Sequence, residues 1–343
     1  MNKALLKRVG NMEQLCSVRQ STLSEGEGRG MRIAQFRNAA GLDFTVLPDR
    51  CMDLYDFSYK GVNLSFRSKN GLRSSVGFVP MKGEFAEQWP GGMLYTCGLD
   101  NVGGHCEQGA IYPTHGRISS VPARHFGVKA GWEGDDYRLE AHGEMVQSRL
   151  YGMQMSLERM ISTGMHDKHI SICDRIFNLD AEDTPYLLLY HMNFGFPLLN
   201  EGCRVLTSPV HVEPLNERST DPANMIAPED GRQEELYLCH AQTEKCAAVL
   251  FNPKLELGGY VAFETRNLPR FLEWKMMKSH DYVLALEPCN TWGISRCDAI
   301  REGKAAVLPA YSSAEMRLEL GVVDGMRELE ALAEEYNLRE ASL

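Results

Sequence analysis

Two titratable residues, each preceded by an apolar run, carry the strongest chemical signal in this sequence. His191 follows the run Tyr186–Tyr190, and Glu287 follows the run Asp281–Leu286. Such runs indicate buried strands, and a titratable residue at the end of a strand lies at the rim of a sheet, where clefts form. A histidine and a carboxylate at such rims can act as an acid/base pair, so the sequence predicts an enzyme. Taken singly, His191 also fits a hydrogen-bonded core histidine, and Glu287 a solvated rim residue.

A glycine-rich segment, Gly91–Gly104, contains Asp100 and Asn101 and is followed by His115 and Arg117. Glycines let the backbone approach another group closely, and the polar side chains beside them would be aimed at that group. The same pattern is explained by turns, with the histidine and the arginine stabilising a loop. The sequence leaves both interpretations open.

Arg50 ends an apolar run at a turn. Its planar fork of donors suits vicinal hydroxyls or a carboxylate. The alternative is an ordinary ion pair with its neighbour Asp49 or with Asp53.

Three tryptophans could stack on the apolar face of a sugar or simply fill the core: Trp89, Trp274 and Trp292. We favour Trp292 for stacking because it lies closest in sequence to Glu287. Other chemistries have little support, since the sequence has neither a Gly-x-Ser-x-Gly elbow nor a phosphate-binding glycine loop with its lysine. His105 and Cys106 match no common zinc spacing, so no metal site is predicted.

The composition is that of a globular protein with a substantial core. The 343 residues are 43% hydrophobic and 24% charged, with a formal net charge of −10. This charge argues against nucleic acid or an anionic membrane as a partner. The chain shows no signal peptide and no transmembrane run. Its ten cysteines have no CxxC spacing, so we expect reduced cysteines and a cytoplasmic location.

Strand signals dominate the chain, and turn residues recur between them as in a sandwich of antiparallel sheets. Ile170, Ile172 and Ile176 alternate with Cys173 and Phe177, which indicates one buried and one outer face. Helices are predicted only at the ends, at Met1–Val9 and Gly325–Asn337, and the longest loop at Asn216–Glu234. We therefore expect one all-β domain over residues 1–343. The predicted strands are Met31–Phe36, Asp43–Leu47, His169–Leu179, Tyr186–His191, Gly202–Val212, Glu235–Cys239, Cys246–Phe251, Tyr260–Glu264, Tyr282–Leu286 and Glu315–Leu320.

Four motifs, in this order, resemble those of the aldose 1-epimerase (galactose mutarotase-like) superfamily, and of its less characterised aldose epimerase-like branch. They are Cys-Gly-Leu-Asp-Asn-Val-Gly (97–103), His-Gly-Arg-Ile-Ser (115–119), Tyr-His-Met-Asn-Phe-Gly-Phe-Pro (190–197) and Leu-Glu-Pro-Cys-Asn (286–290). The resemblance implies a β-supersandwich of large antiparallel sheets with a sugar cleft on one sheet. It is weaker evidence for the reaction, because sugar-binding and lyase domains share this fold.

The resemblance also implies roles for individual residues. His191 would protonate the ring oxygen of a sugar, and Glu287 would take the proton of the anomeric hydroxyl. His115 would bind or polarise the sugar, and Arg50 would bind it, although the usual Asn-Arg context is missing. The aspartate expected to bind neighbouring hydroxyls has no clear counterpart, and Asp100 or Asn101 would substitute. The predicted substrate-binding residues are Arg50, Asp100, Asn101, His115, Arg117, Asn193 and Trp292.

The chemistry of a hemiacetal agrees with these roles. Ring opening needs a donor at the ring oxygen and an acceptor at the C1 hydroxyl, which a histidine and a glutamate provide without a metal or other cofactor. We therefore predict an aldose 1-epimerase-like isomerase acting on a free sugar or sugar derivative. The alternatives are a non-catalytic carbohydrate-binding or sensing protein and another sugar isomerase or lyase. Pairing of exposed sheet edges makes a homodimer a further hypothesis.

Overall fold

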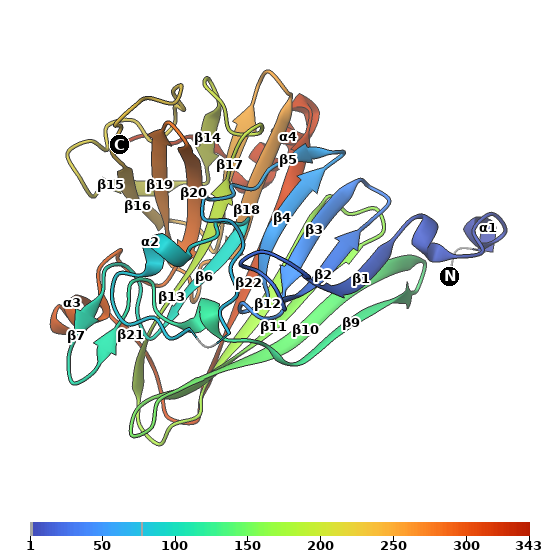
Figure 1. The fold of residues 1–343 in the computed structure, drawn as a ribbon. Coiled ribbons are helices and arrows are strands. Elements are labelled where there is room, and N and C mark those ends of the chain that lie inside the picture. Colours follow the sequence, from blue (N-terminus) through green and yellow to red (C-terminus); the bar gives the residue numbers. More distant parts are fainter. Residues whose placement is uncertain (1–2, 77) are drawn as a thin grey trace.

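The fold is built from two large antiparallel sheets that face each other (Figure 1). The computed structural model describes residues 3–76 and 78–343, and its strands account for the all-β class that the sequence predicts. Within these residues the first sheet has twelve strands and the second has nine. A two-stranded hairpin, β7 (Cys106–Glu107) with β8 (Ile111–Tyr112), lies outside both.

The first sheet holds the strands that carry the candidate catalytic residues. Two short strands lie off its main path: β5 (Val62–Asn63) pairs with β4 (Asp53–Tyr59), and β21 (Ala306–Leu308) pairs with β13 (Thr184–Phe194). The main path of the sheet runs in the order β1 (Ser17–Thr22), β2 (Arg32–Arg37), β3 (Leu42–Leu47), β4 (Asp53–Tyr59), β6 (Leu94–Leu99), β13 (Thr184–Phe194), β20 (Asp281–Cys289), β19 (Arg270–Lys278), β16 (Glu235–Ala241) and β15 (Val210–Pro214).

The second sheet covers one face of the first. Its order is β23 (Arg339–Glu340), β14 (Arg204–Thr207), β17 (Lys245–Asn252), β18 (Leu257–Glu264), β22 (Ser313–Asp324), β12 (His169–Asn178), β11 (Gln154–Gly164), β10 (Asp136–Ser148) and β9 (Arg124–Glu133).

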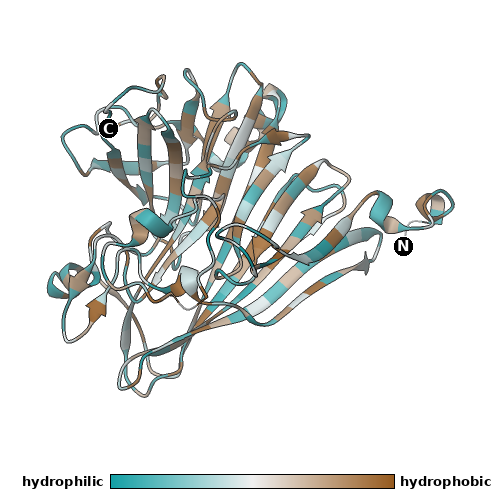
Figure 2. Ribbon diagram, in the orientation of Figure 1, coloured by the Kyte–Doolittle hydropathy of each residue, from teal (hydrophilic) through white to brown (hydrophobic). Residues whose placement is uncertain are grey.

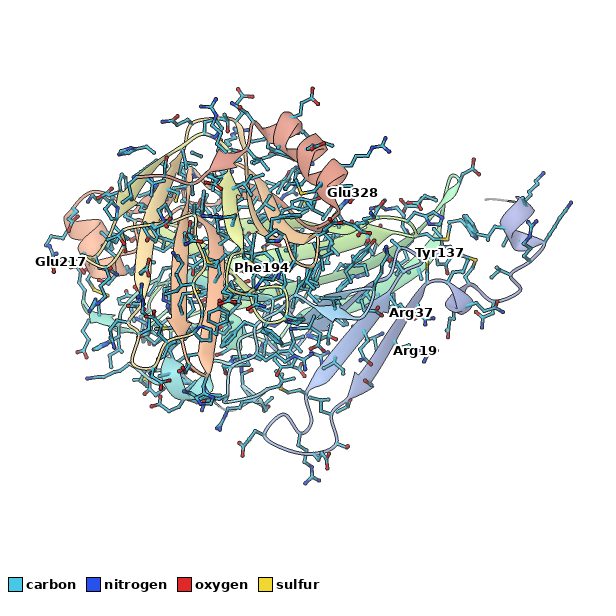
Figure 3. The ribbon with its side chains drawn as sticks, turned by 90° about the horizontal axis from the view of Figure 1, so that it is seen from above. Arg19, Arg37, Tyr137, Phe194, Glu217 and Glu328 are labelled. Atoms are coloured by element: carbon cyan, nitrogen blue, oxygen red, sulfur yellow. A yellow bond between two sulfur atoms is a disulfide. The ribbon has the colours of Figure 1, made fainter. Side chains whose placement is uncertain are left out.

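The main core lies between the two sheets and explains the alternation in the sequence. In β12, Ile170, Ile172 and Ile176 are buried in this core, whereas Cys173 and Phe177 are more exposed, as predicted. The hydropathy colouring alternates along such strands, and side chains fill the space between the sheets (Figures 2 and 3). β13 is buried along almost its whole length because it lies in the middle of its sheet and is covered on both faces. Burial on both faces therefore explains why its sequence is continuously apolar.

A buried ionic cluster also joins the two sheets. Arg159 on β11 pairs with Asp174 on β12 at 2.7 Å and with Asp53 on β4 at 3.1 Å. Asp174 accepts a further hydrogen bond from Tyr190 Oη, and Asp53 accepts one from Thr96 Oγ1. The fully buried guanidinium is thus surrounded by acceptors from both sheets, which offsets the cost of its burial.

The prediction that helices lie only at the chain ends is wrong. The terminal helices exist as α1 (Lys3–Leu6) and α4 (Met326–Tyr336), and the first two residues of the predicted Met1–Val9 helix lie outside the described residues. Two short helices, α2 (Phe85–Gln88) and α3 (Arg296–Arg301), and two 3₁₀ turns, η1 (Met12–Gln14) and η2 (Ile118–Ser120), lie inside the chain. A single turn of helix is too short for a periodic pattern, so the sequence carries little signal for α2.

The prediction that every cysteine is reduced is wrong for one pair. Cys106 in β7 and Cys297 in α3 form a disulfide that fastens the β7–β8 hairpin to this helix. Their separation of 191 residues gives no local motif that sequence reasoning could use. The other eight cysteines are free, and seven of them are buried, where cysteine behaves as a small apolar residue. Within the described residues, no helix is long and apolar enough to span a membrane.

Candidate active site

Adjacent strands bring His191 and Glu287 together on one face of the first sheet. β13 pairs with β20 so that Met192 lies opposite Leu286, which places the two titratable residues side by side. His191 Nε2 lies 3.1 Å from Glu287 Oε1. Both residues lie inside their strands, not at the strand ends that the apolar runs suggested, since β13 continues to Phe194 and β20 to Cys289. The predicted pair is thus held by regular backbone on both sides.

Asn193 fixes the orientation and the tautomer of His191. The Asn193 side-chain amide donates hydrogen bonds to the carbonyls of Gly92 and His191, both at 2.9 Å, so its oxygen must face the imidazole. This oxygen lies 2.5 Å from His191 Nδ1, which therefore carries the proton. In the neutral ring, Nε2 is then the basic atom, and it is the atom next to the Glu287 carboxyl.

Burial shifts both members of the His191–Glu287 pair toward their neutral forms. The pKa of His191 falls to about 3, mainly because of burial and also because of nearby His115, while the Asn193 hydrogen bond partly offsets this. Burial, with a smaller contribution from the Glu234 carboxylate, raises the pKa of Glu287 well above its ordinary value. The favoured state has a neutral imidazole and a protonated carboxyl. Transfer of that one proton would give an imidazolium and a carboxylate without changing the proton count of the pair.

The glycine-rich segment positions His115 against this pair. The His115 backbone has the left-handed conformation (φ 58°), and its carbonyl accepts a hydrogen bond from the amide of Gly98. A Cβ on Gly98 would lie 2.3 Å from the Leu187 carbonyl, and one on Gly116 would lie 2.3 Å from the Gly98 carbonyl. These two glycines therefore permit close packing of protein backbone. The His115 ring lies 5.9 Å from the His191 ring, and burial lowers its pKa to about 4.

Three aromatic side chains, which we call the aromatic cover, enclose the pair. Trp89 and Trp274 each have a ring centre 5.5 Å from that of His191, and Phe85 lies 4.7 Å from His115. Phe85 and Trp89 belong to α2 and its C-terminal end, which lie against this face of the sheet (Figure 1). His191 is only 5% exposed and Glu287 only 3%, so the aromatic cover shields most of the pair from solvent.

Buried polar atoms without hydrogen-bond partners gather around this pair. Within the described residues they include Glu287 Oε1, His115 Nδ1 and Trp89 Nε1. The contact of Glu287 Oε1 with His191 is at ion-pair distance but does not have hydrogen-bond geometry. Buried polar groups are normally paired, so a cluster of unpaired ones indicates a site for a polar ligand. A polyhydroxylated molecule could satisfy the carboxyl, the imidazole and the indole together.

Arg50 lies at the border of the same cluster. It is on the turn between β3 and β4, and its guanidinium lies 6.0 Å from the ring centre of Tyr95. Tyr95 is the residue opposite His191 in the β6–β13 register, and its ring packs 5.6 Å from Phe85. Sequence reasoning missed Tyr95 and Phe85, because an aromatic residue in a strand or a short helix carries no motif of its own.

Four other predicted binding residues, Asp100, Asn101, Arg117 and Trp292, have described contacts with other parts of the protein and not with the His191–Glu287 pair. Asp100 pairs with Arg117 at 2.6 Å. Asn101 donates to the carbonyls of Gly104 and Pro113. Trp292 lies against the guanidinium of Arg270, 4.0 Å away, and the ring of His240, with no described contact to His191. Their roles in substrate binding therefore remain predictions.

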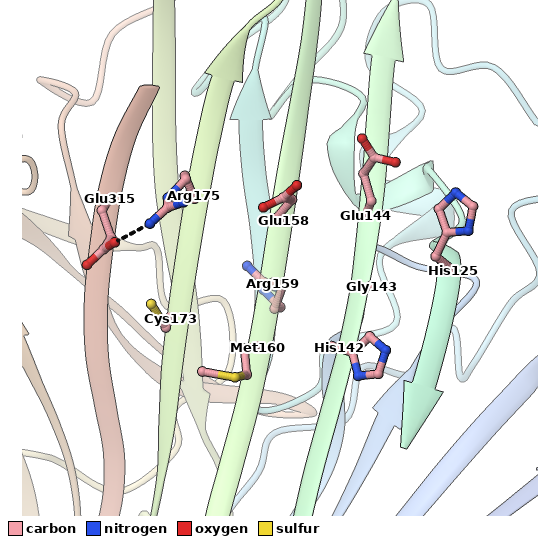
Figure 4. A pocket seen from close by; sticks show the side chains of 10 residues that line it. All are labelled: His125, His142, Gly143, Glu144, Glu158, Arg159, Met160, Cys173, Arg175 and Glu315. Atoms are coloured by element: carbon pink, nitrogen blue, oxygen red, sulfur yellow. Dashed lines mark hydrogen bonds and ion pairs between the residues drawn. The ribbon is translucent and has the colours of Figure 1, made fainter. Parts of the chain in front are cut away.

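A separate hollow lies on the outer face of the second sheet. It is lined by side chains such as His142, Glu158 and Met160, which alternate along their strands with core residues (Figure 4). Arg175 and Glu315 form an ion pair across one side. This hollow is separated from the His191–Glu287 pair by the sandwich core. In residues 3–76 and 78–343, no group of three or more histidine, cysteine, aspartate or glutamate residues is arranged to hold a metal ion.

Comparison with known proteins confirms the predicted fold. Among solved structures, a Klebsiella pneumoniae protein described as a "putative aldose 1-epimerase" matches with a TM-score of 0.85 at 21% identity, over 95% of this chain and 90% of that chain. A galactose mutarotase-like protein from Clostridium acetobutylicum matches with a TM-score of 0.58 at 13% identity, over 91% and 99%. The galactose 1-epimerase of Lactobacillus acidophilus matches with a TM-score of 0.57 at 11% identity, over 90% and 99%. These similarities show the galactose mutarotase-like fold.

A comparison with curated proteins gave no match. The model of a family described as a domain of unknown function, DUF4432, matches residues 28–322. The match spans most of the length of this chain, and the chain therefore belongs to the DUF4432 family.

Proposed function

We propose that this protein is an aldose 1-epimerase-like isomerase that interconverts the anomers of a free sugar or sugar derivative. The main support is the buried His191–Glu287 pair, 3.1 Å apart, which lies beside polar atoms of His115 and Trp89 that have no hydrogen-bond partner in the described part of the chain. The names of the similar structures agree with this reaction, although their low identity supports the fold alone.

The reaction follows from the one proton that the pair holds. After transfer of this proton to Nε2, His191 donates it to the ring oxygen of the sugar while Glu287 takes the proton of the C1 hydroxyl. The bond between C1 and the ring oxygen breaks, leaving an aldehyde and a new hydroxyl. Rotation about the C1–C2 bond and reversal of both transfers closes the ring as the other anomer. The enzyme returns to its starting protonation state, and no oxidant or reductant is consumed.

Two properties of the site would assist this reaction. Exclusion of water by the aromatic cover strengthens the interactions of the pair with developing charge. The Asn193 contact holds the imidazole with Nε2 toward the reacting atoms. Acid/base assistance contributes roughly 10²–10⁴-fold per group, which is sufficient for a reaction that also proceeds slowly in water.

Anomer exchange measured by NMR over a panel of hexoses, pentoses and acidic sugars tests the proposal. We expect exchange with at least one sugar, and loss of about 100-fold or more of it in both His191→Ala and Glu287→Gln, with sugar binding retained. His142→Ala and Glu158→Gln, on the outer face of the second sheet, are matched controls. Binding without exchange in the unmodified protein would contradict the proposal and favour a carbohydrate-binding or sensing role. A change at any carbon other than C1 would favour another isomerase or a lyase.

A further inference from the structure

Arg50 differs from the arginines around it because no carboxylate neutralises it. It is 2% exposed, and no carboxylate oxygen of the described residues lies within ion-pair distance. Both partners that the sequence offered are engaged elsewhere, since Asp49 pairs with Arg32 at 2.6 Å and Asp53 pairs with Arg159. The predicted alternative of an ion pair with Asp49 or Asp53 is therefore wrong.

The hydrogen bonding of Arg50 is also incomplete. Among the described residues its guanidinium has one hydrogen-bond acceptor, the Arg73 carbonyl, which lies 2.9 Å from Nη1. The neighbouring arginines each have a carboxylate: Arg32 with Asp49, Arg73 with Glu27, Arg117 with Asp100 and Arg159 with Asp174. A buried cation without a counter-charge is strongly unfavourable, and a bound anion removes that cost.

The position of Arg50 places this charge within reach of a sugar in the candidate active site. Its guanidinium lies over the ring of Tyr95, and residues opposite each other in a sheet have Cβ atoms roughly 5 Å apart. One pyranose ring with a substituent is long enough to contact His191 at its ring oxygen and the guanidinium through that substituent.

From these observations, and resting on the proposed function, we propose that Arg50 selects sugars that carry a carboxylate, so that the substrate is a sugar acid such as a hexuronic acid. One guanidinium neutralises one charge, which matches a carboxylate and leaves a dianionic phosphate ester only partly neutralised. The planar fork of arginine also fits the two oxygens of a carboxylate. Arg50 is in this view a specificity-determining residue, and the protons are moved by His191 and Glu287.

Pairs of sugars that differ only at C6 test this assignment. For D-glucuronate against D-glucose, and D-galacturonate against D-galactose, we expect kcat/KM for anomer exchange to favour the acid. Arg50→Gln should lower kcat/KM for the acid about 100-fold and change it less than threefold for the neutral sugar. Arg50→Lys keeps the positive charge but not the planar fork of donors. Its kcat/KM for the acid should lie between the values of the unmodified protein and of Arg50→Gln. Arg67→Gln removes an exposed arginine that pairs with Asp56, so it is the matched control and should leave both values unchanged.

The ratio of kcat/KM for the acid to kcat/KM for the neutral sugar separates a specificity role of Arg50 from a structural one, because a folding defect lowers both values together. An equal loss for acid and neutral sugar in Arg50→Gln would overturn the assignment, as would a preference of the unmodified protein for the neutral sugar. A preference for glucose 6-phosphate over glucuronate would overturn the carboxylate assignment.

Calorimetric binding keeps this proposal separable from the proposed function. If no sugar shows anomer exchange, the isomerase proposal fails, while binding of glucuronate that is lost in Arg50→Gln still supports the sugar-acid site. Equal binding of glucuronate and glucose, or glucuronate binding unchanged in Arg50→Gln, overturns the sugar-acid site.

Discussion

Glu273 on β19 should make the stability of this protein depend on pH in a way that one substitution removes. Its side chain is fully buried on the face of the first sheet that looks toward the core, and neither carboxyl oxygen has a hydrogen-bond partner in the described residues. Burial raises its pKa from 4.5 to about 8. Lys275 opposes this rise, and Glu235 and Asp221 add to it. Glu273→Gln removes the titration while keeping nearly the same shape.

The sign and size follow from this shift. Because the folded pKa is raised, the stability that Glu273 contributes is fully present below pH 4.5 and is lost as the pH rises toward about 8. The loss reaches at most about 5 kcal/mol, with a slope approaching about 1.4 kcal/mol per pH unit inside this window. Glu273→Gln should therefore gain relative stability steadily from pH 5 to pH 8.

Urea unfolding at several pH values measures this difference. Glu158→Gln, at an exposed position on β11, is the control and should follow the unmodified protein. Parallel stability curves for Glu273→Gln and the unmodified protein between pH 5 and pH 8 would refute the reasoning, because they would mean that Glu273 titrates alike in the folded and unfolded states.

Three further predictions concern the candidate active site and the core. The pH profile of kcat/KM should be bell-shaped, with its acid limb approaching the lowered His191 pKa of about 3, and an acid limb near pH 6.5 would contradict the burial of His191. Asn193→Ala frees the imidazole and should lower kcat about 10- to 100-fold in protein that is still folded, and an unchanged kcat would show that Asn193 does not orient His191. The same substitution should cost about 1–3 kcal/mol in urea unfolding, because two buried hydrogen bonds of the amide are lost. Arg159→Met leaves the Asp174 and Asp53 carboxylates buried without their cation and should cost about 3–5 kcal/mol in urea unfolding. The added replacement Asp174→Asn should recover part of that loss, and a loss below about 1 kcal/mol for Arg159→Met alone would contradict the importance of the cluster.

Much of the fold could be predicted because buried strands have a recognisable pattern of apolar residues in the sequence. The inward isoleucines of β12 and the continuous apolar run of β13 were recognised, as was the long loop between β15 and β16. The predicted strand Gly202–Val212 is in fact two strands, β14 and β15, which belong to different sheets. A change of sheet at a short turn does not alter the apolar pattern.

Other strands escaped prediction because their outer faces are polar. β9, β10 and β11 carry charged and small residues outward, and their inward residues include Arg159, so their sequences lack a clean apolar alternation. They pair with one another and with β12 as consecutive antiparallel strands, so their composition, and not their topology, is the reason that they were missed.

The candidate active site was predictable only in part. His191, Glu287, His115 and Arg50 lie in or beside one cluster. The first three came from motifs that keep their order along the chain, whereas Arg50 lies outside those motifs and was singled out for its position at a turn. The role of Tyr95 depends on which strands become neighbours, and that of Phe85 on where α2 packs. The missing counter-charge of Arg50 also required coordinates, because Asp49 and Asp53 are its nearest acids in sequence and both turn to other partners.

The position of α2 over the site has a kinetic consequence. If Phe85 and Trp89 must swing away before a sugar contacts the pair, the observed association rate should level off as sugar concentration rises. The plateau would report the opening frequency of one helical turn, and shortening Trp89 should raise it even where proton transfer itself becomes slower. The fastest turnover this protein can reach would then be set by the opening of α2 and not by the proton transfers.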